Sequence, residues 1–224
     1  TFGWAPQLAV RLEPKPGWVV WTSVGRGYRL PDVWELYGNR GASVGNLELN
    51  PESGWRGDVG FSVDGAFSKV SSGSLALVAF YKRDQDRIVY IQNATSTLVP
   101  VNFGESRAWG LETSAMWDLS ERVFVQGQLT FMWTENLDER PELRGNRLPR
   151  VPLASGSVSI TAKPHKSLSL GYGLTLTAGN YWDATNWYLS APRHIHNSWL
   201  RFSPDGGPLS VELSVLNLFN RTKT

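Results

Sequence analysis

The sequence predicts an all-β fold in which antiparallel strands run up and down a single sheet. Three observations predict it. Segments of about ten residues alternate between apolar and polar side chains, helical patterns are nearly absent, and the connections switch regularly between short and long. A sheet with one smooth rim and one elaborated rim produces this rhythm, because neighbouring connections lie at opposite ends of the strands.

The alternating segments place ten strands along the chain. The expected strands span residues 7–13, 17–25, 54–67, 73–84, 105–117, 122–134, 152–163, 166–177, 194–203 and 208–217. Residues 88–92 and 98–101 are expected to prolong one hairpin. A single helical turn is expected at residues 31–37, where Asp32 and Glu35 lie near its start.

The connections divide into two groups. We expect short turns at residues 14–17, 68–72, 119–121, 164–165 and 204–207. Long loops are expected at residues 26–53, 85–104, 135–151 and 178–192. Transmembrane β-barrels of outer membranes have this arrangement, with short periplasmic turns and long extracellular loops.

The strand at residues 105–117 shows what the two faces of the sheet carry. One face presents Trp109 and Trp117 with apolar residues between them, whereas Gly110 and Glu112 lie on the other face. Eight residues separate the two tryptophans, roughly 26 Å at about 3.3 Å per residue. With the usual tilt of about 40°, this gives about 20 Å of height, close to the apolar band of a transmembrane barrel. Three further tryptophans near strand ends fit the interfacial girdles of such a barrel: Trp18, Trp133 and Trp199.

Composition is compatible with this interpretation. Hydrophobic residues make up 41% of the 224 residues and no run approaches the length of a membrane helix, but barrel strands expose only half of their residues to lipid. Eleven Trp and 22 Gly suit girdles and twisted strands. The absence of Cys excludes a disulfide framework, and the formal charge of +2 gives no case for nucleic acid. The chain starts at Thr1 without Met or a signal peptide, so we expect a mature protein or a piece of one.

Six motifs in chain order resemble the barrel signature of TonB-dependent outer-membrane receptors. They are GRGYRLPDVWELYG at 25–38, GNLELNPE at 45–52, FYKRDQDRIV at 80–89, VNFGESRAWGLE at 101–112, RLPRVP at 147–152 and NLFNR at 217–221. The resemblance covers nearly the whole chain. We interpret the motifs mainly as loop and strand architecture rather than as ligand contacts. Glu112 would then lie on the lumen side, where burial would demand a cationic or hydrogen-bonding partner.

The resemblance implies an antiparallel transmembrane β-barrel with 22 strands, of which residues 1–224 supply about ten. The plug domain and the TonB-binding segment of the family are not visible in this sequence, and the terminal strand is missing. Ten strands cannot form the wide barrel of the family, because an open edge in lipid leaves backbone groups unpaired. We therefore expect a fragment, a partial chain, or a chain that other polypeptides complete.

The implied function is a receptor and transporter in the outer membrane of a Gram-negative bacterium. It would take up a scarce nutrient, namely a siderophore, cobalamin, haem or an oligosaccharide, with energy supplied through TonB and the plug. Its other partner would be outer-membrane lipid. Candidate ligand contacts are Trp34, Tyr37 and Arg40 in the first long loop and Trp182, Trp187 and Tyr188 in the fourth, although tryptophans beside lipid headgroups are an equally good account of these positions.

Two other classes of function stay open at the level of sequence. A receptor-like barrel could serve as a structural scaffold or a subunit of an outer-membrane complex. A soluble, Trp-rich carbohydrate-binding sandwich would also show alternating strands, with the tryptophans in its core.

Enzymatic signatures are missing from the sequence. His194 and His196 are spaced to lie on one strand face, but no third ligand is evident, so structural or pore-lining roles are favoured over a metal site. No nucleophile elbow or phosphate loop is present. No catalytic residue, cofactor or resident metal is expected.

Overall fold

The computed structural model describes residues 3–40, 43–92, 96–204 and 208–221. Within them the chain forms twelve strands and one short helix, α1 (Val33–Tyr37). The strands are β1 (Gln7–Lys15), β2 (Trp18–Arg29), β3 (Asn39–Arg40), β4 (Ser43–Val44), β5 (Glu52–Ser68), β6 (Ser71–Gln92), β7 (Leu98–Ser120), β8 (Val123–Asn136), β9 (Ala154–His165), β10 (Leu168–Ala178), β11 (Arg193–Phe202) and β12 (Val211–Val215). Among these residues, no helix is long and apolar enough to cross a bilayer.

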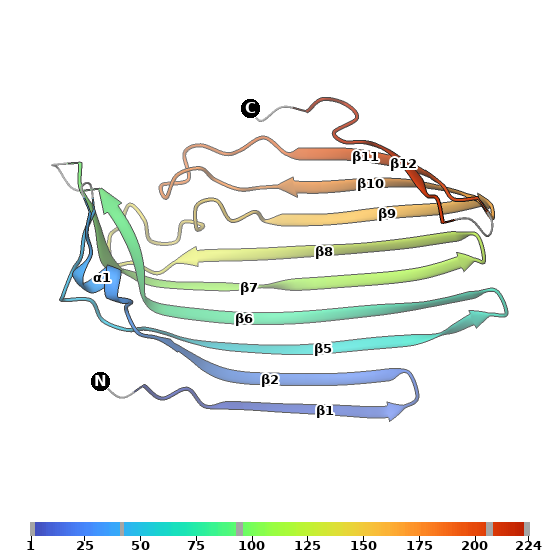
Figure 1. Ribbon diagram of the computed structural model, residues 1–224. Helices are drawn as coiled ribbons and strands as arrows, with labels where there is room; N and C mark the ends of the chain where they lie inside the picture. The colour runs from blue at the N-terminus through green and yellow to red at the C-terminus, as the bar shows by residue number, and fades with distance from the viewer. Residues whose placement is uncertain (1–2, 41–42, 93–95, 205–207, 222–224) are drawn as a thin grey trace.

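Ten of the strands form a continuous antiparallel sheet in the order β1-β2-β5-β6-β7-β8-β9-β10-β11-β12. They correspond one to one to the ten predicted strands, which confirms the predicted fold. The short connections lie together at one rim and the long connections at the other (Figure 1). Part of the expected turn at residues 204–207 lies outside the described residues. The sheet is open, with β1 and β12 as its edges.

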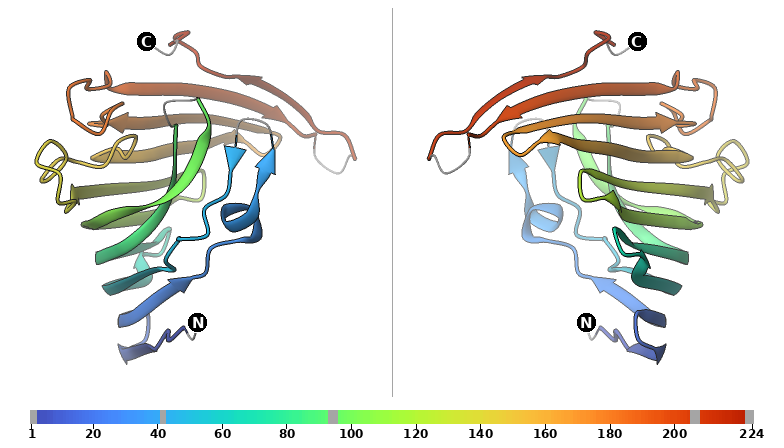
Figure 2. Two further views of the ribbon diagram at one scale, coloured as in Figure 1. Left: turned by 90° about the vertical axis from the view of Figure 1, so that its left-hand side faces the viewer. Right: turned by 90° about the vertical axis from the view of Figure 1, so that its right-hand side faces the viewer.

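The hairpin of β6 and β7 extends beyond its neighbours, as predicted for residues 88–92 and 98–101. Ile88 pairs with Asn102, and the pairing continues to Gln92 and Leu98. The first long loop folds against this extension, where Ser43 of β4 pairs in parallel with Leu98. The sheet is curved, and α1, β3 and β4 lie over its concave side at the long-loop rim (Figure 2).

The register of the strands assigns each side chain to one of two faces. Glu112 of β7 stands opposite Thr130 of β8, and its row continues through Ser155 and Thr177 on a polar face. The apolar face carries Leu, Val and Ile side chains, many of them exposed. Exposed apolar side chains of this number are typical of a sheet whose partner is lipid, because a protein core would cover them.

Tryptophans occur on both faces of the sheet. Trp109 and Trp133 stand opposite each other on the apolar face, as expected for a girdle. Trp199 was expected to belong to a girdle, but it lies on the polar face over Gly171, where an added Cβ would overlap its indole ring. Trp21 lies over Gly60 in the same way. The prediction for Trp199 is therefore wrong, because nearness to a strand end does not reveal on which face a residue lies.

Candidate ligand-binding site

The first long loop begins with a helix whose start is fixed by its own side chains. The Asp32 carboxylate accepts a hydrogen bond from the amide of Glu35 (2.7 Å), and Glu35 accepts one from the amide of Asp32 (2.8 Å). This reciprocal capping box satisfies two amides that the helix itself leaves free. The helical turn predicted at residues 31–37 is thus confirmed.

Arg29 joins this helix to the barrel wall. Its guanidinium donates to both carboxylate oxygens of Glu35 (2.9 and 3.1 Å) and to both of Glu52 at the start of β5 (2.9 and 2.7 Å). Glu52 also accepts a hydrogen bond from the backbone amide of Ile88 in the extended hairpin (2.7 Å). The planar guanidinium suits two bidentate carboxylate contacts, which an ammonium group could not reproduce. Arg29, Glu35 and Glu52 are motif residues, so the interpretation of these motifs as architecture is supported.

Asparagines dock the remainder of the loop onto the hairpin. Asn46 Nδ2 donates to the carbonyl of Pro100 (3.0 Å). Asn102 Oδ1 accepts a hydrogen bond from the amide of Asn50 (2.7 Å). Asn102 Nδ2 donates to the carbonyls of Asn50 (2.9 Å) and Asp86 (2.7 Å). The bonds from Asn46 to Pro100 and between Asn50 and Asn102 reach across more than fifty residues of sequence, and they hold the first loop and the hairpin together as one assembly.

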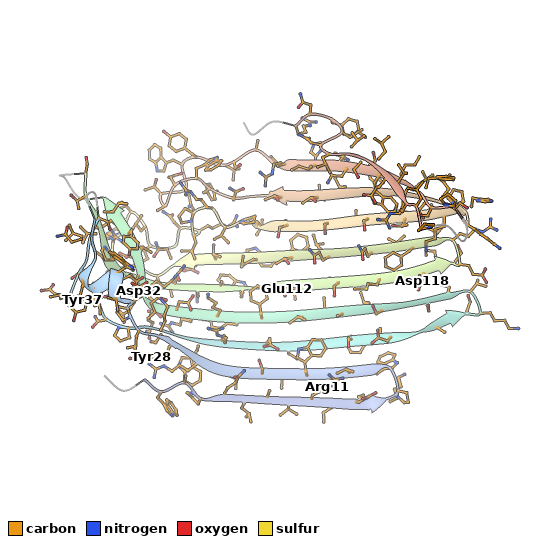
Figure 3. The ribbon with its side chains drawn as sticks, viewed as in Figure 1. Arg11, Tyr28, Asp32, Tyr37, Glu112 and Asp118 are labelled. Carbon is orange, nitrogen blue, oxygen red and sulfur yellow. The ribbon has the colours of Figure 1, made fainter. Side chains whose placement is uncertain are left out.

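This first assembly displays two of the predicted contact residues. Trp34 is 53% exposed and Tyr37 is 68% exposed on α1. Figure 3 shows Tyr37 and Asp32 at the long-loop end of the sheet, with Glu112 midway along β7. The side chain of Arg40 lies outside the described part of the chain.

The loop after β8 (residues 137–153) and the loop after β10 (residues 179–192) form a second assembly. The Arg147 amide donates to Asn186 Oδ1 (2.7 Å), and Asn186 Nδ2 donates to the Arg147 carbonyl (2.9 Å). Asn146 reaches the Ala184 carbonyl (3.1 Å), and Arg147 Nη1 reaches the Gly179 carbonyl (2.7 Å). Burial lowers the pKa of the Arg147 guanidinium. The two loops therefore hold each other in position.

Asp183 shapes the tip of the fourth loop. Its carboxylate accepts hydrogen bonds from the backbone amides of Thr185 (3.1 Å), Trp187 (3.1 Å) and Tyr188 (2.8 Å), and another from the Thr185 hydroxyl. Hydrogen bonding to the charged form, above all from the Thr185 hydroxyl, lowers the Asp183 pKa from 3.8 to about 2. This arrangement leaves Trp187 83% exposed and Tyr188 69% exposed.

A recess of about 700 Å³ opens beside this second assembly. Its wall contains three arginines, Arg150, Arg193 and Arg221, together with Trp182 and Phe219. Of the predicted contact residues whose side chains the structure describes, only Trp182 lines it. The sequence does not reveal these arginines as a group, because they belong to three separate segments that only the folded chain brings together. The Asp-x-Thr pattern at Asp183 could have indicated a side-chain-stabilised turn.

The structure bears on two expectations about individual residues. Glu112 lies on the polar face as expected, and it is exposed rather than buried. His194 and His196 were expected in structural or pore-lining roles; both lie on the apolar face, opposite Leu176 and Leu174, which favours the structural role. His196 contacts the Tyr172 hydroxyl and packs edge-on against Phe219 (4.7 Å between centroids).

The open curved sheet, its two chemically distinct faces and its braced long-loop rim define part of the wall of an outer-membrane β-barrel. Residues 1–218 match the family described as TonB dependent receptor-like, beta-barrel. The chain belongs to this family. The family and its structural neighbours are receptors and transporters of the Gram-negative outer membrane rather than enzymes. In such a barrel wall the polar face is the side of the lumen and the apolar face is the outward side.

Solved receptors share the fold at low sequence identity. The ferric yersiniabactin uptake receptor FyuA from Yersinia pestis is 20% identical, with a TM-score of 0.72 over 96% of this chain and 32% of its own. The siderophore receptor PirA from Pseudomonas aeruginosa is 17% identical, with a TM-score of 0.70 over 98% of this chain and 37% of its own. The copper transporter OprC is 19% identical, with a TM-score of 0.72 over 97% and 33%. The chain thus spans about a third of the length of these structures.

Proposed function

We propose that this chain is part of the wall and ligand-capturing rim of a receptor that takes up a scarce nutrient through TonB-coupled energy. The observation that carries the proposal is the pair of braced assemblies at the long-loop rim. Each holds exposed aromatic side chains in place through hydrogen bonds to the other loops or the wall. Preorganised aromatic residues lose little conformational entropy when a ligand binds, which favours capture from dilute solution.

The chemistry of the recess indicates which ligands to test first. Three arginines beside Trp182 favour an anionic ligand with a flat or apolar part. Metal chelates with carboxylate or catecholate groups have this character, and the structural neighbours include receptors for ferric yersiniabactin and ferric citrate and a copper transporter. Ferric siderophores therefore come before cobalamin, haem and oligosaccharides as ligands to test.

The test measures affinity and uptake in the complete protein that carries this chain. Ferric chelates, haem and cobalamin are compared, and Trp34→Ala, Tyr37→Ala, Trp182→Ala, Trp187→Ala and Tyr188→Ala are each measured with the preferred ligand. Loss of one stacking contact should weaken binding by about fivefold to thirtyfold, roughly 1–2 kcal/mol. Trp117→Ala, at the opposite rim on the apolar face, is the control and should bind normally.

Unchanged affinity and uptake in an aromatic variant would remove that residue from the site. Uptake that persists after deletion of TonB would contradict the energy coupling. If none of the ligands binds and other chains co-purify on the long loops, the scaffold function would be supported instead.

A further inference from the structure

Two histidines of β11 bring their ring nitrogens together on the apolar face. His194 and His196 are two residues apart on one strand, so both side chains lie on the same side of the sheet. His194 Nδ1 and His196 Nε2 lie 2.9 Å apart, and the two ring planes stand at 87°. The spacing in the sequence indicates only the shared face, whereas the structure shows that one nitrogen of each ring faces the other. We call these two residues the histidine pair.

The ring of His196 is held by contacts on its other sides. The Tyr172 hydroxyl lies within hydrogen-bonding distance of His196 Nδ1. Phe219 packs against the ring edge-on, with 4.7 Å between the centroids. The Leu218 amide donates to the His196 carbonyl (2.7 Å) and thereby fixes the segment that carries Phe219. Tyr172 therefore occupies one ring nitrogen and leaves the other for His194, and a hydrogen bond at the second nitrogen is how proteins usually orient a metal-binding histidine.

The separation of the two nitrogens fits neighbouring ligands of a square-planar ion. With metal–nitrogen bonds of about 2.0 Å, nitrogens 2.9 Å apart subtend an angle of about 90° at the metal. A tetrahedral ion with the same bond length would separate them by about 3.3 Å. Square-planar coordination by nitrogen and oxygen is typical of Cu(II), which is also the divalent first-row ion that such ligands bind most tightly.

We propose that the histidine pair binds a Cu(II) ion through His194 Nδ1 and His196 Nε2. A neutral imidazole has one nitrogen lone pair, and His196 carries it on Nε2 when its Nδ1–H donates to the Tyr172 oxygen. His194 carries it on Nδ1 in the matching tautomer, and rotation of its ring aims both lone pairs at one ion. In the described part of the chain, no third His, Cys, Asp or Glu completes a metal-binding group, so the remaining positions go to ligands from solution.

The recess at the long-loop rim gives an ion access to the histidine pair. His194 lines this recess, and both histidines are half-buried. Arg150, Arg193 and Arg221 line it too, and their charges repel a bare dication. The ion is therefore expected to keep anionic ligands, such as hydroxide or a carboxylate, in its remaining positions. Such ligands lower the charge of the complex and attract the arginines.

The third histidine of the chain provides a matched control. His165 ends β9 at the short-turn rim, and its Nδ1 accepts a hydrogen bond from the Ser167 amide (3.2 Å). The chain has three histidines, so His165 has no second histidine on its strand with which to chelate an ion. Removal of His165 should therefore leave binding by the histidine pair unchanged.

The experiment titrates the complete, detergent-purified protein with Cu(II) and records its electron paramagnetic resonance spectrum. Each variant is first shown to keep the heat-dependent gel mobility of a folded barrel. The unmodified protein should gain a bound Cu(II) signal with coupling to two nitrogens, and His165→Gln should give the same signal and affinity. His194→Gln combined with His196→Gln should lose it. Tyr172→Phe keeps both ligands but removes the orienting contact, so it should weaken binding by about tenfold.

Three results would contradict the site. Equal Cu(II) signals in the double-histidine variant and in the unmodified protein would show that the ion binds elsewhere. An equal loss in His165→Gln would assign the signal to adventitious binding by surface histidines. Zn(II) that displaces Cu(II) at equal concentration would contradict the square-planar geometry, because that ion prefers a tetrahedral arrangement.

Discussion

Arg147 and Asn186 lie 39 residues apart in the sequence and exchange two hydrogen bonds between two neighbouring loops. The Arg147 amide donates to Asn186 Oδ1 and Asn186 Nδ2 donates to the Arg147 carbonyl, at 2.7 and 2.9 Å. Asn186 makes both bonds with a positive φ of 60°, a conformation that asparagine tolerates better than most residues. The Asn186 amide side chain thereby bonds both backbone groups of Arg147, as a residue of a neighbouring strand would. These bonds hold the two loops together at a place where no strands pair.

We predict that Asn186→Gly separates the two loops. Glycine keeps the backbone conformation but removes both side-chain bonds, a loss of about 1–3 kcal/mol in local stability. Hydrogen exchange at residues 144–153 and 179–190 should accelerate correspondingly. Asn217→Gly is the control, because Asn217 also has a positive φ (52°) and its bonds lie in another segment. Unchanged exchange in Asn186→Gly would show that other contacts suffice.

Protonation of Asp183 at low pH should lower the local stability of the fourth loop. Because its pKa is about 2 in the folded loop and 3.8 ordinarily, its contribution is fully present above pH 4 and is lost as the pH falls through about 2. A carboxylate ¹³C titration, assigned by comparison with Asp183→Asn, should give a midpoint near 2. A midpoint near 4 would contradict the hydrogen bonds to Thr185, Trp187 and Tyr188.

Replacement of Arg29 should release the first loop even when the positive charge is kept. Arg29→Lys preserves the charge but cannot make bidentate contacts with Glu35 and Glu52 simultaneously, so we expect a loss of about 1–3 kcal/mol in the local stability of α1. Proteolytic cleavage within residues 30–51 of the complete protein should become at least fivefold faster. Arg11→Lys on β1 provides the control. Equal cleavage rates in the two variants would show that charge alone holds the loop.

Two glycines on the lumen face of β10 should respond differently to the same substitution. A Cβ at Gly171 would overlap the Trp199 ring, whereas a Cβ at Gly173 meets nothing within 4 Å. Gly171→Ala should therefore lower the unfolding free energy of the complete barrel by about 1–3 kcal/mol. Gly173→Ala should be neutral or slightly stabilising. Denaturant titration followed by the gel mobility of folded and unfolded barrel measures both, and similar midpoints would refute the role of Trp199.

Much of the fold could be predicted because its determinants are local. Period-two alternation places residues on two faces in each strand separately, and turn residues near Gly17 end one strand and begin the next. The ten principal strands, the extended hairpin and the capped turn at Asp32 follow from such patterns. The motif interpretation also needed no tertiary information, since order and spacing along the chain carried it.

The sequence could not show which residues come together at the long-loop rim, because this depends on distances between segments that are far apart in the chain. Arg150, Arg193 and Arg221 meet in one recess only when curvature and register bring three segments together. Likewise, the assignment of Trp199 to the polar face and of His194 to the apolar face depended on the register with β10. Alternation along one strand separates its residues into two sets but does not show which set lies on which face of the sheet. Only the pairing of the strand with its neighbours decides this.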